Sequence, residues 1–272
     1  MTSTVTDTPA IRAAARRLET AATTGTPVAP IRDLIDRDDV ASAYEVQRLG
    51  IQRRETAGAR VIGRKIGLTS PAVQRQLGVD RPDFGFLLDD MRTPQTPVER
   101  RPRLLQPKVE AELAFVLAED LDRDRLDAAG VRGAVDYAVA ALEIVDSRIA
   151  DWDIGFADTV ADNASSGWFA LGSGGVPLDR FEPRDITMHM IIDGELASEG
   201  TGTACLGDPL EALAWLARTA REFGDPLRSG EIVLSGALGP MATLTPGAAV
   251  HAELFLGSSL LSAVDFTWEV SA

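Results

Sequence analysis

The sequence predicts an α+β protein in which a helical N-terminal segment precedes a β-rich core. Up to residue 60, apolar residues recur at helical spacing, whereas from residue 61 short apolar runs are separated by Gly and Pro. Later helical patterns are confined to stretches near 71–77, 123–137 and 208–223, which is not the strict alternation of a parallel β-α-β fold. We therefore expect a helical segment over 1–60 and a β-rich domain over 61–272.

The N-terminal segment contains two predicted helices. Over residues 9–23 the apolar residues keep helical spacing, at Ile11, Ala14, Ala15, Leu18 and Ala22. Pro27 and Pro30 end this helix. The second helix, over 38–54, has acidic residues in its first turn and arginines in its last, as the helix dipole prefers.

Runs rich in β-branched and aromatic residues predict the strands of the core. The first of these surrounds Lys65, and two longer runs cover 109–117 and 138–145. The C-terminal third continues with strands over 186–192, 231–235, 249–256 and 262–268. Such a succession favours a mixed or antiparallel sheet that curls on itself.

Composition excludes several classes of function. The chain has 272 residues and a formal net charge of −14, which argues against nucleic acid or an anionic membrane as partner. No apolar run approaches the roughly 20 residues that span a bilayer, and no signal peptide is visible, so we expect a cytoplasmic protein. Cys205 is the single cysteine and cannot form an internal disulfide. We find no glycine loop typical of nucleotide binding.

Three glutamates indicate a metal site. Glu110 and Glu112 lie two positions apart in a predicted strand, so both side chains leave the same face. Adjacent carboxylates in apolar surroundings are costly unless a cation neutralises them. Glu143, in a second predicted strand, joins them if the two strands are neighbours. Oxygen ligands suit Mg²⁺ or Mn²⁺, whereas one Cys and two His nearly exclude a Cys/His zinc site. The competing interpretation is a solvated Glu-x-Glu face.

Other polar residues leave two interpretations each. Lys65 in its glycine-flanked strand either extends outward to solvent or lies inward beside carboxylates, where it binds a substrate carboxylate or delivers protons. Asp83 either ends a turn or serves the site. Ser165 belongs to a small-residue loop that is either an anion-binding loop or an ordinary capped turn. His189 and His251 lie in predicted strands, outside any nucleophile–base motif, which disfavours a serine hydrolase.

Several motifs follow one another in order along the chain. They are Gly-Arg-Lys65-Ile-Gly-Leu-Thr-Ser, Gly-Val-Asp-Arg-Pro-Asp83-Phe-Gly, Pro-Lys-Val-Glu110-Ala-Glu112-Leu-Ala-Phe, Leu-Glu143-Ile-Val-Asp-Ser-Arg148, Ala-Asp-Asn-Ala-Ser165-Ser-Gly and Leu-Ser-Gly-Ala-Leu-Gly-Pro-Met241. Together they resemble the 2-keto-4-pentenoate hydratase family of the fumarylacetoacetate hydrolase superfamily. The resemblance covers roughly residues 10–270.

The resemblance implies both fold and chemistry. The fold is a mixed β-roll or barrel core, with residues 61–272 as the catalytic domain, in a homo-oligomer. The activity is that of a hydro-lyase, which adds water to a 2-hydroxy-2,4-dienoate to give a 4-hydroxy-2-oxo acid during meta-cleavage degradation of aromatic compounds. The family's metal ligands fall on Glu110, Glu112 and Glu143, and its acid/base positions on Lys65 and Asp83. Ser165 and Arg148 fall in its substrate-binding segments.

Three alternatives accompany this expectation. A related branch decarboxylates 2-oxo-3-enedioates of the 4-oxalocrotonate type, but it lacks the aspartate that this chain has as Asp83. The superfamily's C–C hydrolases use an early histidine that neither His189 nor His251 matches. A third possibility is a non-catalytic partner subunit, because hydratases of this kind associate with a sister decarboxylase or a downstream aldolase. The intact set of site residues argues against it.

Overall fold

The computed structural model describes residues 7–70, 74 and 81–269. The helix predicted near 71–77 lies outside these residues except for Gln74, which is helical. Five helices are described: α1 (Pro9–Thr24), α2 (Val40–Thr56), α4 (Ala128–Arg132), α5 (Phe156–Ala161) and α6 (Pro209–Glu222). The two predicted N-terminal helices and the helix near 208–223 are therefore confirmed within one or two residues.

Local sequence explains where the long helices begin and end. Thr8 caps α1 by accepting a hydrogen bond from the Ile11 N–H, and Gly25, with φ of 71°, ends that helix in the left-handed conformation. Asp39 and Asp208 cap α2 and α6 in the same way. Each cap satisfies backbone groups that the first turn of a helix leaves unpaired.

The strands form two sheets. The larger sheet has the order β2-β1-β9-β4-β5-β6-β3 and includes β10, which pairs with β4. Its strands are β1 (Val61–Gly67), β2 (Asp83–Leu88), β3 (Arg92–Thr93), β4 (Lys108–Leu117), β5 (Val135–Val145), β6 (Ser166–Leu171), β9 (Ile232–Ala237) and β10 (Ala242–Thr243). Pairing is antiparallel except between β1 and β9 and between β3 and β6, so the sheet is mixed, as predicted.

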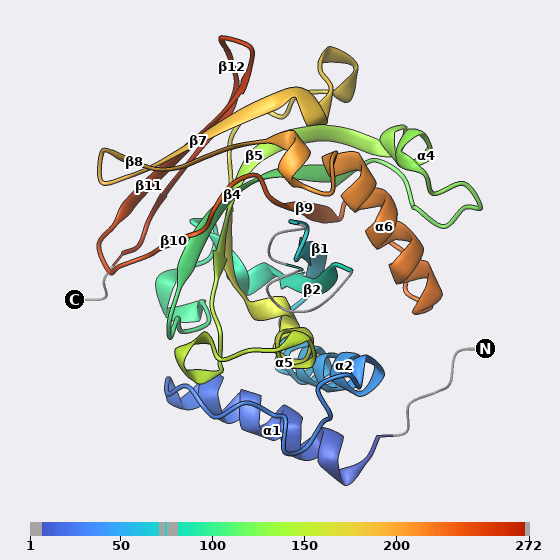
Figure 1. Ribbon diagram of the computed structural model, residues 1–272, viewed down its shortest axis with the longest axis vertical. Helices are drawn as coiled ribbons and strands as arrows, with labels where there is room; N and C mark the ends of the chain where they lie inside the picture. The colour runs from blue at the N-terminus through green and yellow to red at the C-terminus, as the bar shows by residue number, and fades with distance from the viewer. Residues whose placement is uncertain (1–6, 71–73, 75–80, 270–272) are drawn as a thin grey trace.

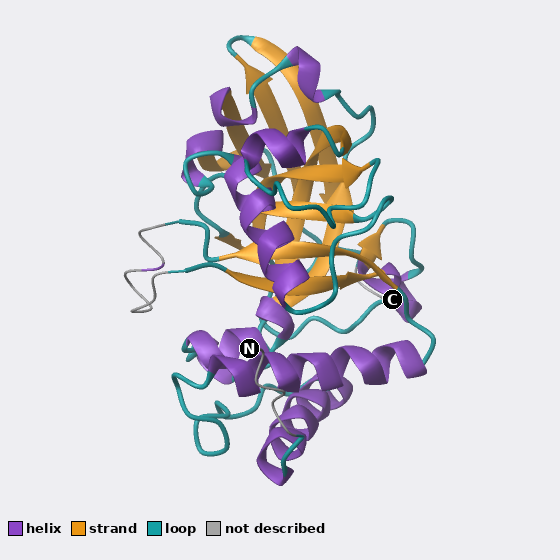
Figure 2. Ribbon diagram, turned by 90° about the vertical axis from the view of Figure 1, so that its right-hand side faces the viewer, coloured by secondary structure: helices purple, strands orange, loops and turns teal. Residues whose placement is uncertain are grey.

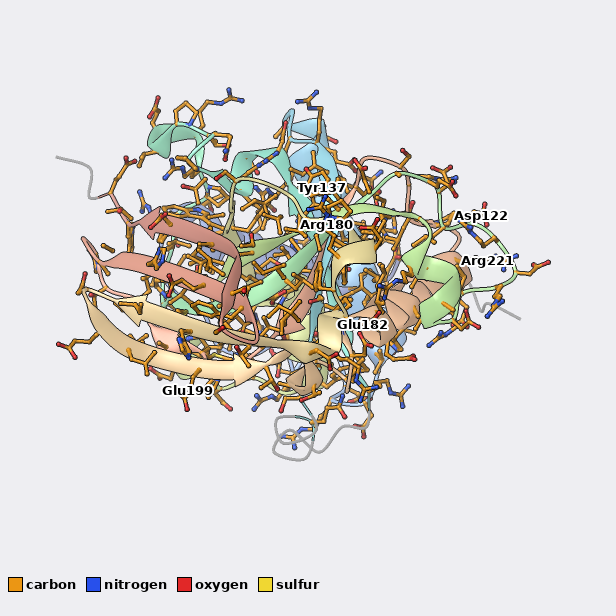
Figure 3. The ribbon with its side chains drawn as sticks, turned by 90° about the horizontal axis from the view of Figure 1, so that it is seen from above. Asp122, Tyr137, Arg180, Glu182, Glu199 and Arg221 are labelled. Atoms are coloured by element: carbon orange, nitrogen blue, oxygen red, sulfur yellow. The ribbon has the colours of Figure 1, made fainter. Side chains whose placement is uncertain are left out.

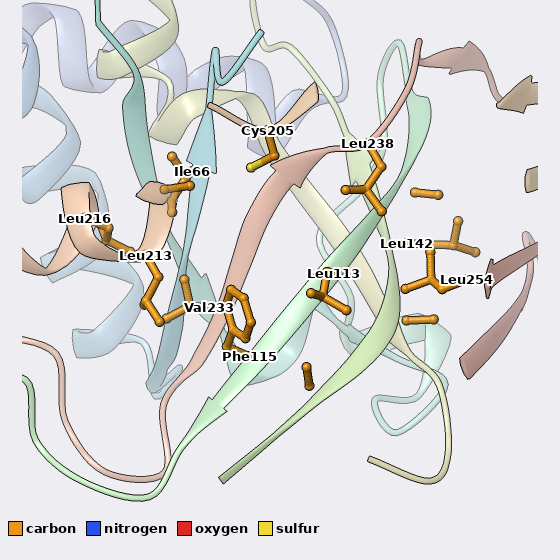
Figure 4. Packing of buried hydrophobic residues seen from close by; sticks show 14 of the residues in the cluster. Ile66, Leu113, Phe115, Leu142, Cys205, Leu213, Leu216, Val233, Leu238 and Leu254 are labelled. Carbon is orange, nitrogen blue, oxygen red and sulfur yellow. The ribbon is translucent and has the colours of Figure 1, made fainter. Parts of the chain in front are cut away.

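The smaller sheet packs across the larger one (Figure 1). Its order is β12-β11-β7-β8, from β7 (Ile186–Ile192), β8 (Glu195–Thr201), β11 (Ala249–Leu256) and β12 (Ser259–Thr267). The main core fills the space between the sheets and α6: Leu213 of α6 and Leu254 of β11 lie on either side of Leu113 on β4 (Figure 4). Cys205 is buried in this core.

The N-terminal helices form a separate layer with α5 beneath the strands (Figures 1 and 2). Ile11 and Leu18 of α1 and Val46 of α2 share a buried apolar cluster with Phe156 and Val160 of α5. Helices α1 and α2, from the start of the chain, therefore pack on α5, which comes from the middle of the chain. This packing brings α2 close to the β-rich domain.

One predicted helix is wrong. Over 123–137 the chain forms only the short α4, and β5 already begins at Val135. Gly130 and Gly133 weaken a helix here, and β5 gains an antiparallel partner in β4 along nearly its whole length. Tertiary pairing outweighs the local helical pattern.

Most charged side chains project outward around the periphery, as Asp122, Glu199 and Arg221 do in Figure 3. In the described part of the chain, no helix is long and apolar enough to cross a membrane. Because most charged side chains are exposed, a buried carboxylate is unusual in this protein.

Candidate metal centre and active site

The strand pairing brings the three predicted metal ligands together. In the antiparallel register of β4 and β5, Glu110 lies directly opposite Glu143, and Glu112 leaves the same face of β4 two residues on. One carboxylate oxygen from each residue lies within 4.8 Å of the other two. The side chains are 8%, 0% and 1% exposed for Glu110, Glu112 and Glu143, respectively, so the interpretation as a solvated face is wrong.

The electrostatics of this cluster favour a bound cation. Burial and the neighbouring carboxylates raise the pKa of Glu110 to about 8 and also raise the pKa of Glu112. Glu112 Oε2 accepts a hydrogen bond from the Gly236 N–H at 2.7 Å. Its other oxygen and Glu143 Oε2 find no hydrogen-bond donor within the described residues, and Glu143 Oε1 has the Lys65 ammonium at 3.2 Å. Buried carboxylate oxygens without donors, in an all-oxygen set, fit a hard divalent cation.

Gly236 is a site residue to which sequence analysis assigned no role. Its φ of 110° belongs to the region that glycine tolerates, and this conformation aims its N–H at Glu112. A Cβ added at this position would lie 2.4 Å from Thr69 Oγ1. The Leu-Ser-Gly motif was the available signal, but which carboxylate it serves follows only from the pairing of β4 with β9.

Lys65 of β1 points inward, so the outward interpretation is wrong. Its side chain is 4% exposed, and Nζ lies 3.2 Å from Glu143 Oε1. Burial acts to lower the pKa of Lys65, but Glu143, Asp83 and the other carboxylates outweigh burial and raise it. Lys65 therefore stays an ammonium at neutral pH.

Asp83 is the first residue of β2 and faces Lys65 across Gly67. Gly67 is its register partner on β1, and a Cβ there would lie 2.2 Å from Asp83 Oδ1 and 3.4 Å from Lys65 Nζ. Glycine thus leaves the space in which the two charged groups converge. Burial raises the pKa of Asp83, and Lys65 opposes this effect. Asp83 Oδ1 has no hydrogen-bond partner among the described residues.

Ser165 reaches Asp83 through Thr159 of α5, a residue that sequence analysis did not single out. Thr159 Oγ1 lies 3.4 Å from Asp83 Oδ2 and 3.3 Å from Ser165 Oγ. Ser165 is the third of three consecutive residues with positive φ, after Asn163 and Ala164, at 54°, 50° and 53° along the chain. Such a left-handed turn of non-glycine residues is costly, of order 1–2 kcal/mol per residue, and persists only when its surroundings hold it.

Arg148 holds this turn. Its Nε lies 2.6 Å from Asp162 Oδ1, its Nη1 donates to the Ser166 carbonyl at 2.7 Å, and its Nη2 donates to the Asp162 carbonyl at 2.5 Å. Burial raises the pKa of Asp162 to about 6, against the effect of Arg148. Arg148 also lines a cavity of about 420 Å³ beside α1 and α2, which contains none of Lys65, Asp83 and the three glutamates. The structure thus groups six predicted site residues and places Arg148 behind them.

Both histidines lie on the smaller sheet, as structural residues would. His251 Nδ1 is 2.8 Å from Asp265 Oδ1 on the neighbouring strand, and its Nε2 is 3.4 Å from Glu253 Oε1. The His189 ring centroid lies 5.4 Å from that of Phe255. Neither histidine belongs to the carboxylate cluster.

The arrangement can bind and polarise a small anionic substrate. A cation site, a fixed ammonium and a carboxylate with a raised pKa meet in one buried place, with hydroxyl groups beside them. Such a set can stabilise charge on an oxygen while Asp83 exchanges a proton with a substrate or with water.

Comparison with known proteins identifies the family of this chain. Residues 70–262 match the fumarylacetoacetate (FAA) hydrolase C-terminal family. The chain is 53% identical to a 2-keto-4-pentenoate hydratase of Paraburkholderia xenovorans over 86% of this chain and 87% of that protein. It is 51% identical to the TodF product hydratase of Pseudomonas putida F1, over 88% and 90%, respectively.

A solved structure extends the likeness over nearly the whole chain. The 4-oxalocrotonate decarboxylase of Pseudomonas putida G7, complexed with magnesium and adipate, superposes with a TM-score of 0.84 at 30% identity. The match covers 96% of this chain and 98% of the decarboxylase. Fold and relatives agree, and the chain belongs to the 2-keto-4-pentenoate hydratase family, which has the fumarylacetoacetate hydrolase fold.

Proposed function

We propose that this protein is a metal-dependent hydro-lyase that converts a 2-hydroxy-2,4-dienoate and water into a 4-hydroxy-2-oxo acid. The observation that carries the proposal is the convergence of Lys65 and Asp83 on a buried carboxylate triad. Relatives about half identical to this chain, named as hydratases, support the same activity. Meta-cleavage of aromatic compounds yields substrates of this class.

Glu110, Glu112 and Glu143 are the residues that would hold the metal ion. Their oxygens suit magnesium or manganese, and the solved relative with magnesium supports this choice. A bound ion supplies a Lewis acid that stabilises negative charge on the substrate's 2-oxygen. Gly236 holds Glu112 in place through its N–H.

Lys65 and Asp83 have different roles in this scheme. Because its pKa is raised, Lys65 keeps its proton and is better suited to anchor the substrate carboxylate than to donate a proton. Asp83, whose pKa is raised by burial, exchanges protons. The 2-hydroxyl loses its proton while C5 gains one, which leaves a 2-oxo-3-enoate. Asp83 then takes a proton from water as the water oxygen bonds to C4, and C3 receives a proton.

Ser165 and Thr159 hydrogen-bond the substrate or the attacking water. Their hydroxyls form a series of contacts that ends at Asp83. Ser165 Oγ lies 3.3 Å from Thr159 Oγ1, which lies 3.4 Å from Asp83 Oδ2. Arg148 supports this line from behind, because it holds the turn that carries Ser165. Its predicted part in substrate binding is then indirect.

The direct test is turnover of freshly prepared 2-hydroxypenta-2,4-dienoate, followed by ultraviolet absorbance and product analysis. With Mg²⁺ we expect loss of the diene and formation of 4-hydroxy-2-oxopentanoate, and with a chelator no turnover. Asp83→Asn should abolish most turnover, whereas the exposed Asp122→Asn serves as the matched control and should not. Carbon dioxide release from 2-oxohex-3-enedioate without hydration of the dienoate would instead place the chain with the decarboxylases.

We further propose that the enzyme is a cytoplasmic homo-oligomer. Large apolar side chains remain exposed on the described surface, namely Leu196, Phe223, Met241 and Leu260. Light scattering of the purified chain tests this proposal, and a monomer at all concentrations would contradict it. Adding a downstream aldolase or a sister decarboxylase to the same measurement tests association with either enzyme.

A further inference from the structure

Gln47 of α2 is a buried amide that connects two elements of the active site. Its side chain is 2% exposed. Nε2 donates one hydrogen bond to the Phe84 carbonyl at 2.9 Å and another to the Val160 carbonyl at 3.0 Å. One side-chain nitrogen thus ties helix α2 to strand β2 and helix α5 at once.

The two carbonyls belong to the residues that directly follow Asp83 and Thr159. Asp83 and Thr159 are in turn joined by the contact of 3.4 Å between Oδ2 and Oγ1. That distance is near the upper limit of a hydrogen bond, so a small separation of β2 from α5 breaks it. The geometry of this contact therefore depends on what holds the two backbones at their present spacing.

A second contact of α2 acts on the same strand. Tyr44, one turn before Gln47, stacks on the Phe84 ring, with centroids 4.8 Å apart and an interplanar angle of 22°. Together, Tyr44 and Gln47 fix both the side chain and the carbonyl of the residue next to Asp83. Helix α2 lies outside the matched family region of 70–262, yet it reaches the site.

We propose that Gln47 is a positioning residue, which holds Asp83 and Thr159 at the spacing that the hydration step requires. The inference rests on the proposed role of Asp83. Gln47 itself acts only through the Phe84 and Val160 carbonyls. It makes the N-terminal helical segment part of the catalytic machinery and not merely a packing layer.

The test is Gln47→Met, which keeps the length of the side chain and removes both donors. We expect kcat for dienoate hydration to fall between about tenfold and a hundredfold, because small misplacements of catalytic groups have effects of this size. Affinity for Mg²⁺, measured by calorimetry, should stay within twofold, because Gln47 contacts none of the three glutamates. The KM of the substrate should change little.

Two controls separate positioning from general loosening. Gln52→Met makes the same substitution on an exposed face of the same helix. Ser262→Ala removes a buried hydrogen bond between β12 and β5, in which Ser262 Oγ accepts the Ala140 N–H at 2.9 Å. Neither variant should lower kcat by more than twofold. If Ser262→Ala reduces kcat as strongly as Gln47→Met, the inference is wrong.

A double-mutant cycle identifies the residue through which Gln47 acts. In an Asp83→Asn background, Gln47→Met should lower the remaining kcat by less than twofold, because the group being positioned is gone. An equal fall in both backgrounds overturns the inference. If Gln47→Met does not fold, Gln47→Glu replaces it, since a carboxylate keeps the shape and presents an acceptor to two carbonyls. Absence of hydration by the unmodified enzyme refutes the proposed function and is recognised before any variant is compared.

Discussion

Lys65 Nζ lies 3.2 Å from Glu143 Oε1, so a lysine side chain occupies the same buried space as the proposed metal ligands. When all three carboxylates are ionised, as metal binding requires, the ammonium offsets one of their three negative charges and leaves two for a cation. Because Lys65 is not one of the three carboxylates, substitutions of Lys65 and of the glutamates test different functions.

Replacing Lys65 with Met should abolish turnover while leaving metal binding intact. The variant loses the ammonium that anchors the substrate carboxylate in the proposed scheme, and we expect kcat/KM to fall by at least about a hundredfold. Glu110, Glu112 and Glu143 remain, so calorimetry should still detect Mg²⁺ binding. Unchanged turnover in this variant would remove Lys65 from the scheme.

Replacing Glu112 with Gln should weaken metal binding and stabilise the metal-free protein. The amide oxygen can still accept the Gly236 N–H, while the cost of burying a carboxyl group that ionises readily in the unfolded chain disappears. We expect Mg²⁺ affinity to fall at least about tenfold, and the free energy of unfolding in chelator to rise by about 1–3 kcal/mol. Calorimetry and urea unfolding measure the two effects. A fall in both quantities would show that Glu112 is mainly structural.

The stability of the metal-free protein should decrease as the pH rises. Because the folded state raises the pKa of Glu110 from 4.5 to about 8, the folded protein binds more protons than the unfolded chain between these values. The contribution of Glu110 to the free energy of unfolding is therefore fully present below pH 4.5 and is lost as the pH rises to about 8. Saturating Mg²⁺ should remove this loss, because metal binding takes the ionised form.

Urea unfolding at pH 5.5, 7.0 and 8.5 checks this prediction, with chelator in one series and Mg²⁺ in the other. The difference in unfolding free energy between the two series should grow with pH. Parallel curves in the two series would contradict a metal site at these glutamates.

Replacing Arg148 with Met should lower kcat and leave Mg²⁺ affinity unchanged. The left-handed turn at Asn163–Ser165 loses the side chain that ties Asp162 and Ser166 together. We expect a decrease in kcat of about tenfold or more. Arg148→Lys keeps the charge but not the forked geometry, so it should resemble the Met variant. If Arg148 instead binds the substrate carboxylate directly, Arg148→Lys will retain most activity and the Met variant will chiefly raise KM.

His251 should contribute to stability only at low pH. Its hydrogen bond with Asp265 raises the pKa of the imidazole, so the stabilising charge is present below 6.5 and is lost as the pH rises through the pKa in the folded state. His251→Gln should therefore lower the melting temperature at pH 5.5 and leave it unchanged at pH 8.5. Hydration activity serves as the control and should be unaffected, since His251 lies on the smaller sheet.

The sequence predicted the buried carboxylate cluster because strand periodicity alone places Glu110 and Glu112 on one face. Glu143 required only that β4 and β5 be neighbours, which consecutive strands usually are. The shared motifs then located Lys65, Asp83 and Ser165. These predictions depend on short-range pattern or on resemblance, and the structure groups the residues accordingly.

The residues that sequence analysis missed act over long separations. Gln47 binds carbonyls of residues 84 and 160, and Thr159 faces Asp83 from α5. No local pattern distinguishes a helical glutamine that packs inward from one that does not. Arg148 shows the converse, because its motif marked the segment but its role depends on where Asp162 lies in the fold. The helix predicted over 123–137 failed because pairing with β4 favoured a strand from Val135 onward.

The parallel pairing of β1 with β9 has a consequence for biosynthesis. Lys65 is the register partner of Leu234. Strand β1, at the start of the β-rich domain, can therefore form this pairing only after β9, near the end of the domain, has been synthesised. During translation, β4 and β5 can pair early, but the Gly236 N–H that holds Glu112 does not yet exist. The proposed metal centre is therefore complete only after most of the chain has been synthesised, and until then the edges of β1 and β4 that pair with β9 are open.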